Sequence, residues 1–223
     1  PLLPLLLSPF YATTMSLSPI PAALDALRAG KFVIIVDDED RENEGDLVIA
    51  GEDISAEKMA FLIRQTGGVV CLSLENAIAD QLDLPPMVER NTSHFGTSFT
   101  VSIEAREGVT TGISASDRAK TVLTAMNPVA TPEDLRRPGH VFPLRAASGG
   151  VLQRTGHTEA AVDLARLAGK RPGAVISELM HDDGSMMRLP ALLEFAKKHA
   201  IPIISIADLI AYRRVHEPFV RLE

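Results

Sequence analysis

The spacing of hydrophobic positions along the chain predicts strands interleaved with helices. Short apolar runs that are bounded by turn residues are typical of buried strands. They lie at residues 32–36, 46–50, 69–74, 174–178 and 202–206. Residues 97–104 instead alternate Phe, Val and Ile with Ser and Thr, which predicts a half-buried strand.

Helical segments are predicted between these strands. They cover residues 22–29, 55–65, the segment from Ser114, the segment from His157 to near Gly169, and the segments from Pro190 and Asp208. Ser55 is expected to cap the second helix, and Ser114 with Asp117 three positions later has the spacing of a capping box. Gly30 is expected to close the first helix.

Together these elements predict an α+β fold, with helices packed around a mixed β-sheet in a single layered α/β domain. Residues 85–96 and 127–156 hold little regular pattern. Loops of that length in a compact domain are usually functional or disordered. The second stretch carries His140 and leads to His157, two histidines that each follow a glycine and lie near arginines.

Composition narrows the class of protein. The 223 residues are 46% hydrophobic with no tryptophan, so aliphatic side chains must fill the core. The formal net charge of −7 argues against a nucleic-acid footprint. The single cysteine, Cys71, rules out an intrachain disulfide framework and suits the cytoplasm. In its predicted strand, we expect Cys71 to be a buried apolar residue rather than a substrate contact.

The N-terminal sequence PLLPLLL is apolar but too short to span a membrane, so we expect no membrane association. No basic residue precedes it, which makes it a poor signal peptide. Met15 is a candidate natural start, with residues 1–14 as an extension.

The decamer DDEDRENEGD at residues 37–46 holds seven carboxylates between two predicted strands. Acidic runs are usually solvated faces, but this one is held at both ends. Gly45 suggests a turn that aims neighbouring side chains. Crowded carboxylates repel one another, and a divalent cation would compensate them. The calcium-loop spacing does not fit, thiolate sites are excluded by the single cysteine, and magnesium fits best.

Residues 154–158 suggest a phosphate cradle. Arg154 supplies a permanently charged, planar guanidinium group. Gly156 allows the backbone to approach a ligand closely, and Thr158 lies where a helix begins. His157 could supply a metal-binding nitrogen beside it. In the alternative interpretation, Thr158 merely caps the helix and His157 is a surface residue.

Six sequence motifs, which occur in a fixed order along the chain, make the sequence pattern specific. They are DDEDRENEGD (37–46), GVTTGISASDRA (108–119), RPGHVFPLRA (137–146), GHTEAAVDLA (156–165), SELMHDDGSM (177–186) and DLIAYRR (208–214). Together they closely resemble the 3,4-dihydroxy-2-butanone 4-phosphate synthase family of riboflavin biosynthesis. The resemblance covers residues 20–215, which leaves residues 1–19 as a non-matching, partly disordered extension and 216–223 as a tail. Many family members have cysteine at the position of Ser177, a difference from which we expect little functional cost.

The resemblance implies a carbon–carbon lyase that converts D-ribulose 5-phosphate into L-3,4-dihydroxy-2-butanone 4-phosphate and formate. It implies Mg²⁺ as cofactor, with Mn²⁺ as a substitute, and a homodimer with shared active sites. The metal ligands implied are Glu42 and His157, and the catalytic residues are Glu42, Asp46, His140 and Glu178. The substrate-binding residues implied are Arg41, Glu42, Asp46, Thr111, Arg154, Thr155, Gly156, His157, Thr158 and Glu178. The remaining carboxylates of the acidic run have no assigned role.

Two further expectations and two alternatives follow. The acidic loop, hinged at Gly45, is a candidate lid that excludes water from a reactive enediol. The GVTTG segment and His140 are expected to reach into the site from the partner chain. One alternative is a non-catalytic metal-binding homologue that kept the fold. The other is a domain excised from a bifunctional protein that also carries GTP cyclohydrolase II.

Overall fold

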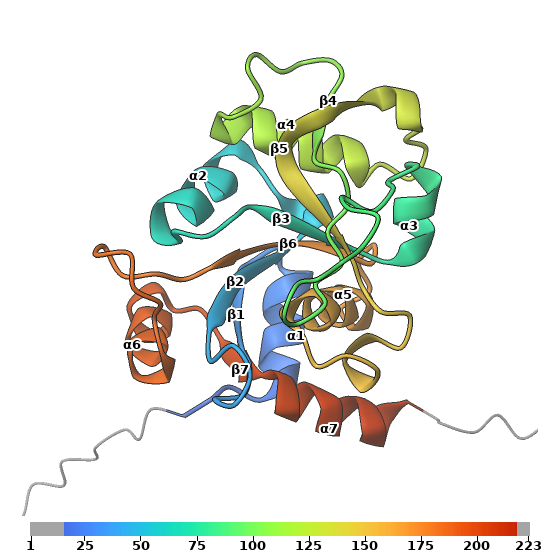
Figure 1. Ribbon diagram of the computed structural model, residues 1–223. Coiled ribbons are helices and arrows are strands. Elements are labelled where there is room, and N and C mark those ends of the chain that lie inside the picture. The colour runs from blue at the N-terminus through green and yellow to red at the C-terminus, as the bar shows by residue number, and fades with distance from the viewer. Residues whose placement is uncertain (1–15, 218–223) are drawn as a thin grey trace, which may run out of the picture.

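The computed structural model describes residues 16–217, which form one seven-stranded mixed sheet with helices on both faces (Figure 1). The strand order is β4-β5-β3-β6-β2-β1-β7, in which β1 pairs with β7 and β3 with β5 in parallel, and the other pairs are antiparallel. The predicted fold class is confirmed. The predictions for residues 1–15 and 218–223 lie outside the described residues.

The strands largely follow the apolar runs of the sequence. They are β1 (Val33–Val36), β2 (Gly45–Ala50), β3 (Cys71–Leu74), β4 (Ile103–Ala105), β5 (Leu135–Arg145), β6 (Gly173–Glu178) and β7 (Ile203–Ser205). Every residue of β1, β2 and β3 is buried, as expected for strands covered on both faces.

The helices match the predicted segments and add one that was not expected. They are α1 (Ile20–Arg28), α2 (Ala56–Gln65), α3 (Asn76–Gln81), α4 (Ala115–Ala125), α5 (His157–Leu167), α6 (Leu189–His199) and α7 (Ile206–His216). The unexpected helix is the short α3. Three single-turn 3₁₀ helices lie at Gly51–Asp53, Pro132–Asp134 and Gly150–Leu152.

The predicted caps are present, with one change of partner. Ser55 accepts a hydrogen bond from the backbone of Lys58, and Ser114 accepts one from Asp117. The carboxylate of Asp117 does not return the bond to complete a capping box. It accepts hydrogen bonds from Thr110 and Gly112 instead, and so holds the GVTTG segment against the start of α4.

Alternating side chains of the strands divide the core into two layers. Ile34 packs with α2, α4 and α6 on one face, whereas Ile35 packs with α1, α5 and α7 on the other. On β2, the side chain of Val48 lies in the second layer. Asp46 is two residues earlier on the same strand, so its side chain points to the same face of the sheet. The sheet therefore presents Asp46 toward the face that α5 covers.

Three expectations need correction. Residues 127–156 are not an irregular loop, because they contain the eleven-residue strand β5, which pairs with β3 on one side and β4 on the other. The half-buried strand predicted at 97–104 is shorter, with isolated bridges from Phe99 to Leu144 and from Thr100 to Pro86 before β4. Its backbone is held locally by β5 and by the segment around Pro86 rather than by a continuous ladder.

Gly45 is not the turn that the sequence suggested. It is the first residue of β2, paired with Val36. A Cβ at this position would come within 2.5 Å of the Leu192 side chain on α6, so close packing explains the glycine. Asn43 has the positive φ of the acidic loop, at 54°. The turn expected at Gly45 is therefore wrong, while the acidic loop as a lid stays a prediction.

Candidate active site

A pair of carboxylates lies at the centre of the candidate site. Asp46 on β2 is directly opposite Glu178 on β6 in the antiparallel ladder. Like charges in this arrangement destabilise a sheet. Burial, together with the negative charges of Glu178, Glu42 and Glu44, raises the pKa of Asp46 to about 7, although His157 opposes the shift. The pair is therefore placed to face a cation.

His157 faces this pair from the first position of α5, with Gly156 as the N-cap. The ring is only 6% exposed, so the alternative of a surface histidine is wrong. Its Nδ1 lies 3.4 Å from Oε2 of Glu42. Burial alone would lower the pKa of His157, but the carboxylates of Asp46, Glu42 and Asp37 outweigh it and raise that pKa to about 9.

The other ring nitrogen of His157, Nε2, is buried and has no hydrogen-bond partner within residues 16–217. A buried nitrogen of this kind costs free energy unless a ligand or an ion completes it. This nitrogen is therefore available to bind an ion or a ligand in the cavity.

Asp37 organises the acidic loop. Its carboxylate accepts hydrogen bonds from the backbone N–H groups of Glu42 (3.0 Å) and Glu44 (2.9 Å). The guanidinium of Arg41 donates to Asp37 (2.9 Å) and to Glu42 (2.7 Å). Because these bonds close the loop onto the end of β1, the side chain of Glu42 is directed toward His157.

The environment of Glu42 keeps it ionised. Partial burial raises its pKa, but the hydrogen bond to His157 and the charge of Arg41 outweigh burial and lower the pKa to about 2. Glu44, two residues on, shows the opposite balance, because burial and the charges of Glu42 and Glu178 raise its pKa. The loop thus presents one firmly ionised carboxylate and one whose charged form is disfavoured.

The residues fit a divalent cation. One ligand atom each from Asp37, Glu42 and His157 lies within 4.8 Å of the others. Two carboxylates and one imidazole suit Mg²⁺ or Mn²⁺, which prefer oxygen ligands and retain waters. Together with the unsatisfied Nε2 of His157, this cluster supports the sequence-based prediction of Glu42 and His157 as ligands and adds Asp37 as a neighbour.

Arg154 lies on the other side of the cavity. Its Nη1 donates to Glu159 on α5 (2.6 Å), and its Nη2 donates to the carbonyl of Phe95 (3.1 Å) and to Thr97 Oγ1 (3.3 Å). Glu159 is buried and also accepts from the backbone of Ala147. Arg154 is therefore held in place at the N-terminus of α5, where free N–H groups favour an anion.

One cavity of about 130 Å³ brings most of the predicted residues together. Its lining includes Arg41, Glu42, Asp46, Arg154, His157, Thr158 and Glu178, with Glu44, Cys71, Thr97, Phe99, Leu144 and Ile176 beside them. Gly156 caps α5 at its edge, and Thr155 faces an adjoining cavity beneath the acidic loop.

His140 and Thr111 do not line this cavity. The Nδ1 of His140 makes a close contact with Glu104 on β4, and its side chain is 45% exposed. Gly112, next to Thr111, approaches the same glutamate so closely that a Cβ there would overlap it. These predicted site residues form a second, exposed group around Glu104.

Several residues of the site were not predicted from the sequence. Glu44 and Cys71 line the cavity, and Asp37 shapes the loop. Gly68 is the least obvious of these residues. A Cβ at Gly68 would lie 1.9 Å from Oε2 of Glu178, and that oxygen accepts the backbone N–H of Val69. The glycine makes room for the catalytic candidate Glu178.

Fold and site together define a class, namely a mixed-sheet α/β protein with a carboxylate–histidine site suited to a divalent cation and an anionic ligand. The family model described as 3,4-dihydroxy-2-butanone 4-phosphate synthase matches residues 21–212. The chain belongs to this family.

Several relatives with this name are similar over nearly their whole length. The chain is 57% identical over 196 residues to the 3,4-dihydroxy-2-butanone 4-phosphate synthase of Edwardsiella ictaluri, covering 88% of this chain and 90% of that protein. A solved structure of such a synthase in complex with two magnesium ions has a TM-score of 0.86 and 44% identity, covering 90% and 98% of the two chains. A two-domain synthase from A. baumannii has a TM-score of 0.89 and 48% identity, covering 92% of this chain and 61% of that chain.

None of the helices in the described part of the chain is long and apolar enough to cross a membrane.

Proposed function

We propose that this chain is a magnesium-dependent carbon–carbon lyase of riboflavin biosynthesis. It converts D-ribulose 5-phosphate into L-3,4-dihydroxy-2-butanone 4-phosphate and formate. The observation that carries the proposal is the convergence of Glu42, His157, Asp46 and Glu178 in one cavity beside Arg154. Family membership and the two magnesium ions in the related structure support the same assignment.

Each group has a part in the chemistry. Arg154 and the start of α5 bind the phosphate, which carries about −1.5 to −2 charges at neutral pH. Glu42 and His157 hold the metal, with Asp37 adjacent, and Mn²⁺ is the proposed substitute. When bound, a divalent cation stabilises negative charge that develops on substrate oxygens.

The remaining carboxylates move protons. A general acid or base works best when its pKa is close to the operating pH, and Asp46 has a pKa of about 7. Its neighbour Glu178 lies opposite it, and Glu44 has a raised pKa. Asp46 therefore takes the proton next to the substrate carbonyl, and Glu44 and Glu178 serve the later transfers. A positioned group of this kind is worth about 10²–10⁴ in rate.

A formate-release assay tests the proposal. We expect turnover of ribulose 5-phosphate that disappears with EDTA and returns with Mg²⁺ or Mn²⁺. Glu39→Gln, an exposed carboxylate in the same loop, is the control and retains activity, whereas Glu42→Gln does not. Activity that survives EDTA would contradict the metal role. Equal turnover of isomerase-free ribose 5-phosphate would contradict the substrate.

We also propose a homodimer whose active sites are shared. The separate group of His140 and Thr111 around Glu104 supports it, because both are candidate site residues that lie outside the cavity of their own chain. The exposed Ile113 next to this group, at 53%, is a suitable interface residue. In an isologous dimer each chain would complete the site of the other.

Subunit mixing tests the shared site. Glu42→Gln and His140→Ala are each expected to be inactive, and mixing them after dissociation should restore roughly a quarter of wild-type activity. Half the dimers are then mixed, and each mixed dimer has one site without a lesion. No recovery, despite heterodimers seen by native mass spectrometry, would mean that both residues serve a site within one chain.

The alternative of a non-catalytic metal-binding homologue makes a different prediction. Such a protein would bind Mg²⁺ but release no formate. All the candidate residues from Arg41 to Glu178 are present in this chain, which favours the enzyme.

A further inference from the structure

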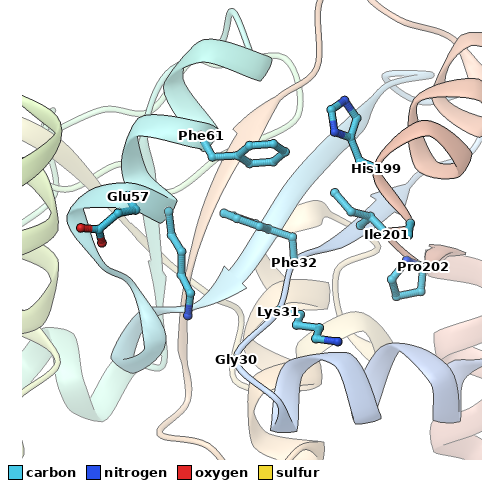
Figure 2. A pocket seen from close by; sticks show the side chains of 10 residues that line it. Gly30, Lys31, Phe32, Glu57, Phe61, His199, Ile201 and Pro202 are labelled. Atoms are coloured by element: carbon cyan, nitrogen blue, oxygen red, sulfur yellow. The ribbon is translucent and has the colours of Figure 1, made fainter.

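A second cavity lies at the far end of the strands that lead to the active site. It has a volume of about 390 Å³ and lies among the start of β1, helix α2 and the segment from α6 to β7 (Figure 2). The acidic loop follows the other end of β1. Four strand residues, at about 3.3 Å each, separate the two ends by about 13 Å. This cavity is therefore distinct from the site described above.

The walls of this cavity are aromatic and apolar. The rings of Phe32 and Phe61 lie 5.3 Å apart, and the ring of His199 meets Phe61 edge-on at 5.4 Å. Ile201 and Pro202 complete the wall, and Figure 2 shows these side chains around one space. Burial lowers the pKa of His199, so the imidazole is neutral at pH 7 and adds to the apolar surface. Such walls suit a flat ring.

The rim of the cavity carries two cations, Lys31 and Lys58. Within the described residues, neither ammonium lies within 4.0 Å of a carboxylate oxygen. Lys58 donates to the backbone carbonyl of Asp53, while the Asp53 carboxylate pairs with Lys170. The carboxylate of Glu57 points away from the rings in Figure 2. The rim is thus positive at the mouth of an aromatic cavity, in a chain whose net charge is −7.

We propose that this cavity is a ligand site for a small planar aromatic molecule that carries one anionic group. The ring stacks between the Phe32–Phe61 pair and the Ile201–Pro202 wall, and the anionic group faces Lys31 and Lys58. The volume lies within the range of small-molecule sites, which is about 300–1,000 Å³. The proposal is independent of the reaction assigned to the other cavity.

The site is also connected to the acidic loop. Helix α6 ends at His199 beside the new cavity, and the residue before its first turn, Arg188, donates to the backbone carbonyls of Glu42 (3.0 Å) and Asn43. Leu192 of the same helix packs against Gly45. A ligand at one end of α6 therefore contacts an element that holds the metal-binding loop at the other.

Calorimetric titration with two probes tests the proposal. 2-Naphthoate has the proposed chemistry, and 2-naphthol is its neutral counterpart. We expect one naphthoate per chain, with naphthol binding about threefold to tenfold more weakly. Lys31→Glu should weaken naphthoate binding by a similar factor and leave naphthol unchanged. Lys120→Glu, the same charge change at an exposed position on α4, is the matched control and should change neither.

The wall is tested by Phe61→Leu, which keeps apolar volume but removes the ring. It should weaken both probes about tenfold while the melting temperature confirms folding. Ribulose 5-phosphate with Mg²⁺ should displace neither probe. The proposal is overturned if naphthoate shows no saturation up to about 5 mM, if Lys31→Glu binds it as the wild type does, or if ribulose 5-phosphate displaces it. The last result would assign the probe to the active site.

Discussion

Two clusters in this protein pair an arginine with carboxylates, and they differ in how their charges are balanced. In the first, Arg213 on α7 donates to Asp163 (2.6 Å) and to Glu217 (2.6 Å), and Asp163 is also paired with Arg166. In the second, Arg41 and His157 face a larger set of carboxylates, namely Asp37, Glu42, Glu44, Asp46 and Glu178.

The pKa shifts of Arg213 and Glu217 favour their charged forms, whereas the candidate site also holds two carboxylates whose charged forms are disfavoured. Hydrogen bonds raise the pKa of Arg213 and lower that of Glu217, so each group is stabilised in its charged form. In the candidate site, burial and neighbouring charges raise the pKa of Asp46 and Glu44, so their charged forms are disfavoured. The balanced cluster stabilises the fold, whereas the site keeps an excess of negative charge that a cation can relieve.

The two clusters are joined by one loop. Asp163 accepts the backbone N–H of Val151, and Arg213 donates to the carbonyl of Gly149, a few residues before Arg154. The balanced cluster thus supports the segment that carries the phosphate-binding candidate. Substitutions should separate these roles. Those in the candidate site should lower activity, and those in the Arg213 cluster should lower stability.

The largest effect is expected for Glu42→Gln in the site. Loss of a metal ligand should lower kcat by at least about 10³. The melting temperature should also fall, because the lowered pKa of Glu42 means that His157 and Arg41 stabilise its charge in the folded state. Steady-state formate release and calorimetry measure the two quantities. Activity that falls only in proportion to the folded fraction would mean that Glu42 is structural and not a metal ligand.

Arg213→Ala in the supporting cluster should lower the free energy of unfolding by about 3–5 kcal/mol, because it leaves Asp163 as a buried, less compensated charge. Urea denaturation measures the loss. Arg214→Ala, at the exposed next position, is the control and should change stability by less than about 0.5 kcal/mol. Similar values for both variants would show that the buried network does not stabilise the fold.

Asp46→Asn should have the opposite and smaller effect. Because folding raises the pKa of Asp46 to about 7, folded wild type binds a proton that the unfolded chain has lost, and its stability falls as pH rises from about 4 to 7. The amide avoids this cost. In metal-free protein, we expect a gain of about 1–3 kcal/mol at pH 8 that vanishes near pH 4.

Urea denaturation at several pH values checks the Asp46→Asn prediction, with the exposed Asp40→Asn as control. A gain that is independent of pH would show that ionisation of Asp46 is not its source. A loss at pH 8 would show that the carboxylate is compensated in the metal-free fold, and the site would then resemble the balanced cluster.

The sequence predicted those elements whose causes are local. The β-branched run of β1 and the cap at Ser55 depend on neighbouring residues, and both are present. Strand β5 was missed because Pro138, Gly139 and Pro143 disfavour a strand, and its pairing partners β3 and β4 hold it in place. The turn expected at Gly45 failed for the same reason, since Leu192 of a distant helix decides that position.

For the site, the family resemblance supplied candidates most of which the structure gathers into one cavity. Gly156 and Thr155 lie beside that cavity, and His140 and Thr111 lie apart from it. The importance of Asp37 and Gly68 was not predicted. Asp37 acts through bonds to the backbone of its own loop, and Gly68 acts by making room for Glu178 on a neighbouring strand. The first depends on the loop conformation and the second on a tertiary contact, and the residue pattern specifies neither.

The central claim is that the excess of carboxylates in the site creates a requirement for a bound metal ion. Thermal unfolding with and without Mg²⁺ tests it most directly, because a ligand that binds only the folded state raises the melting temperature. We predict a rise for wild type and for Arg213→Lys, and none for Glu42→Gln or His157→Ala. An equal rise in Glu42→Gln and wild type would contradict the claim, since the ion would then bind elsewhere.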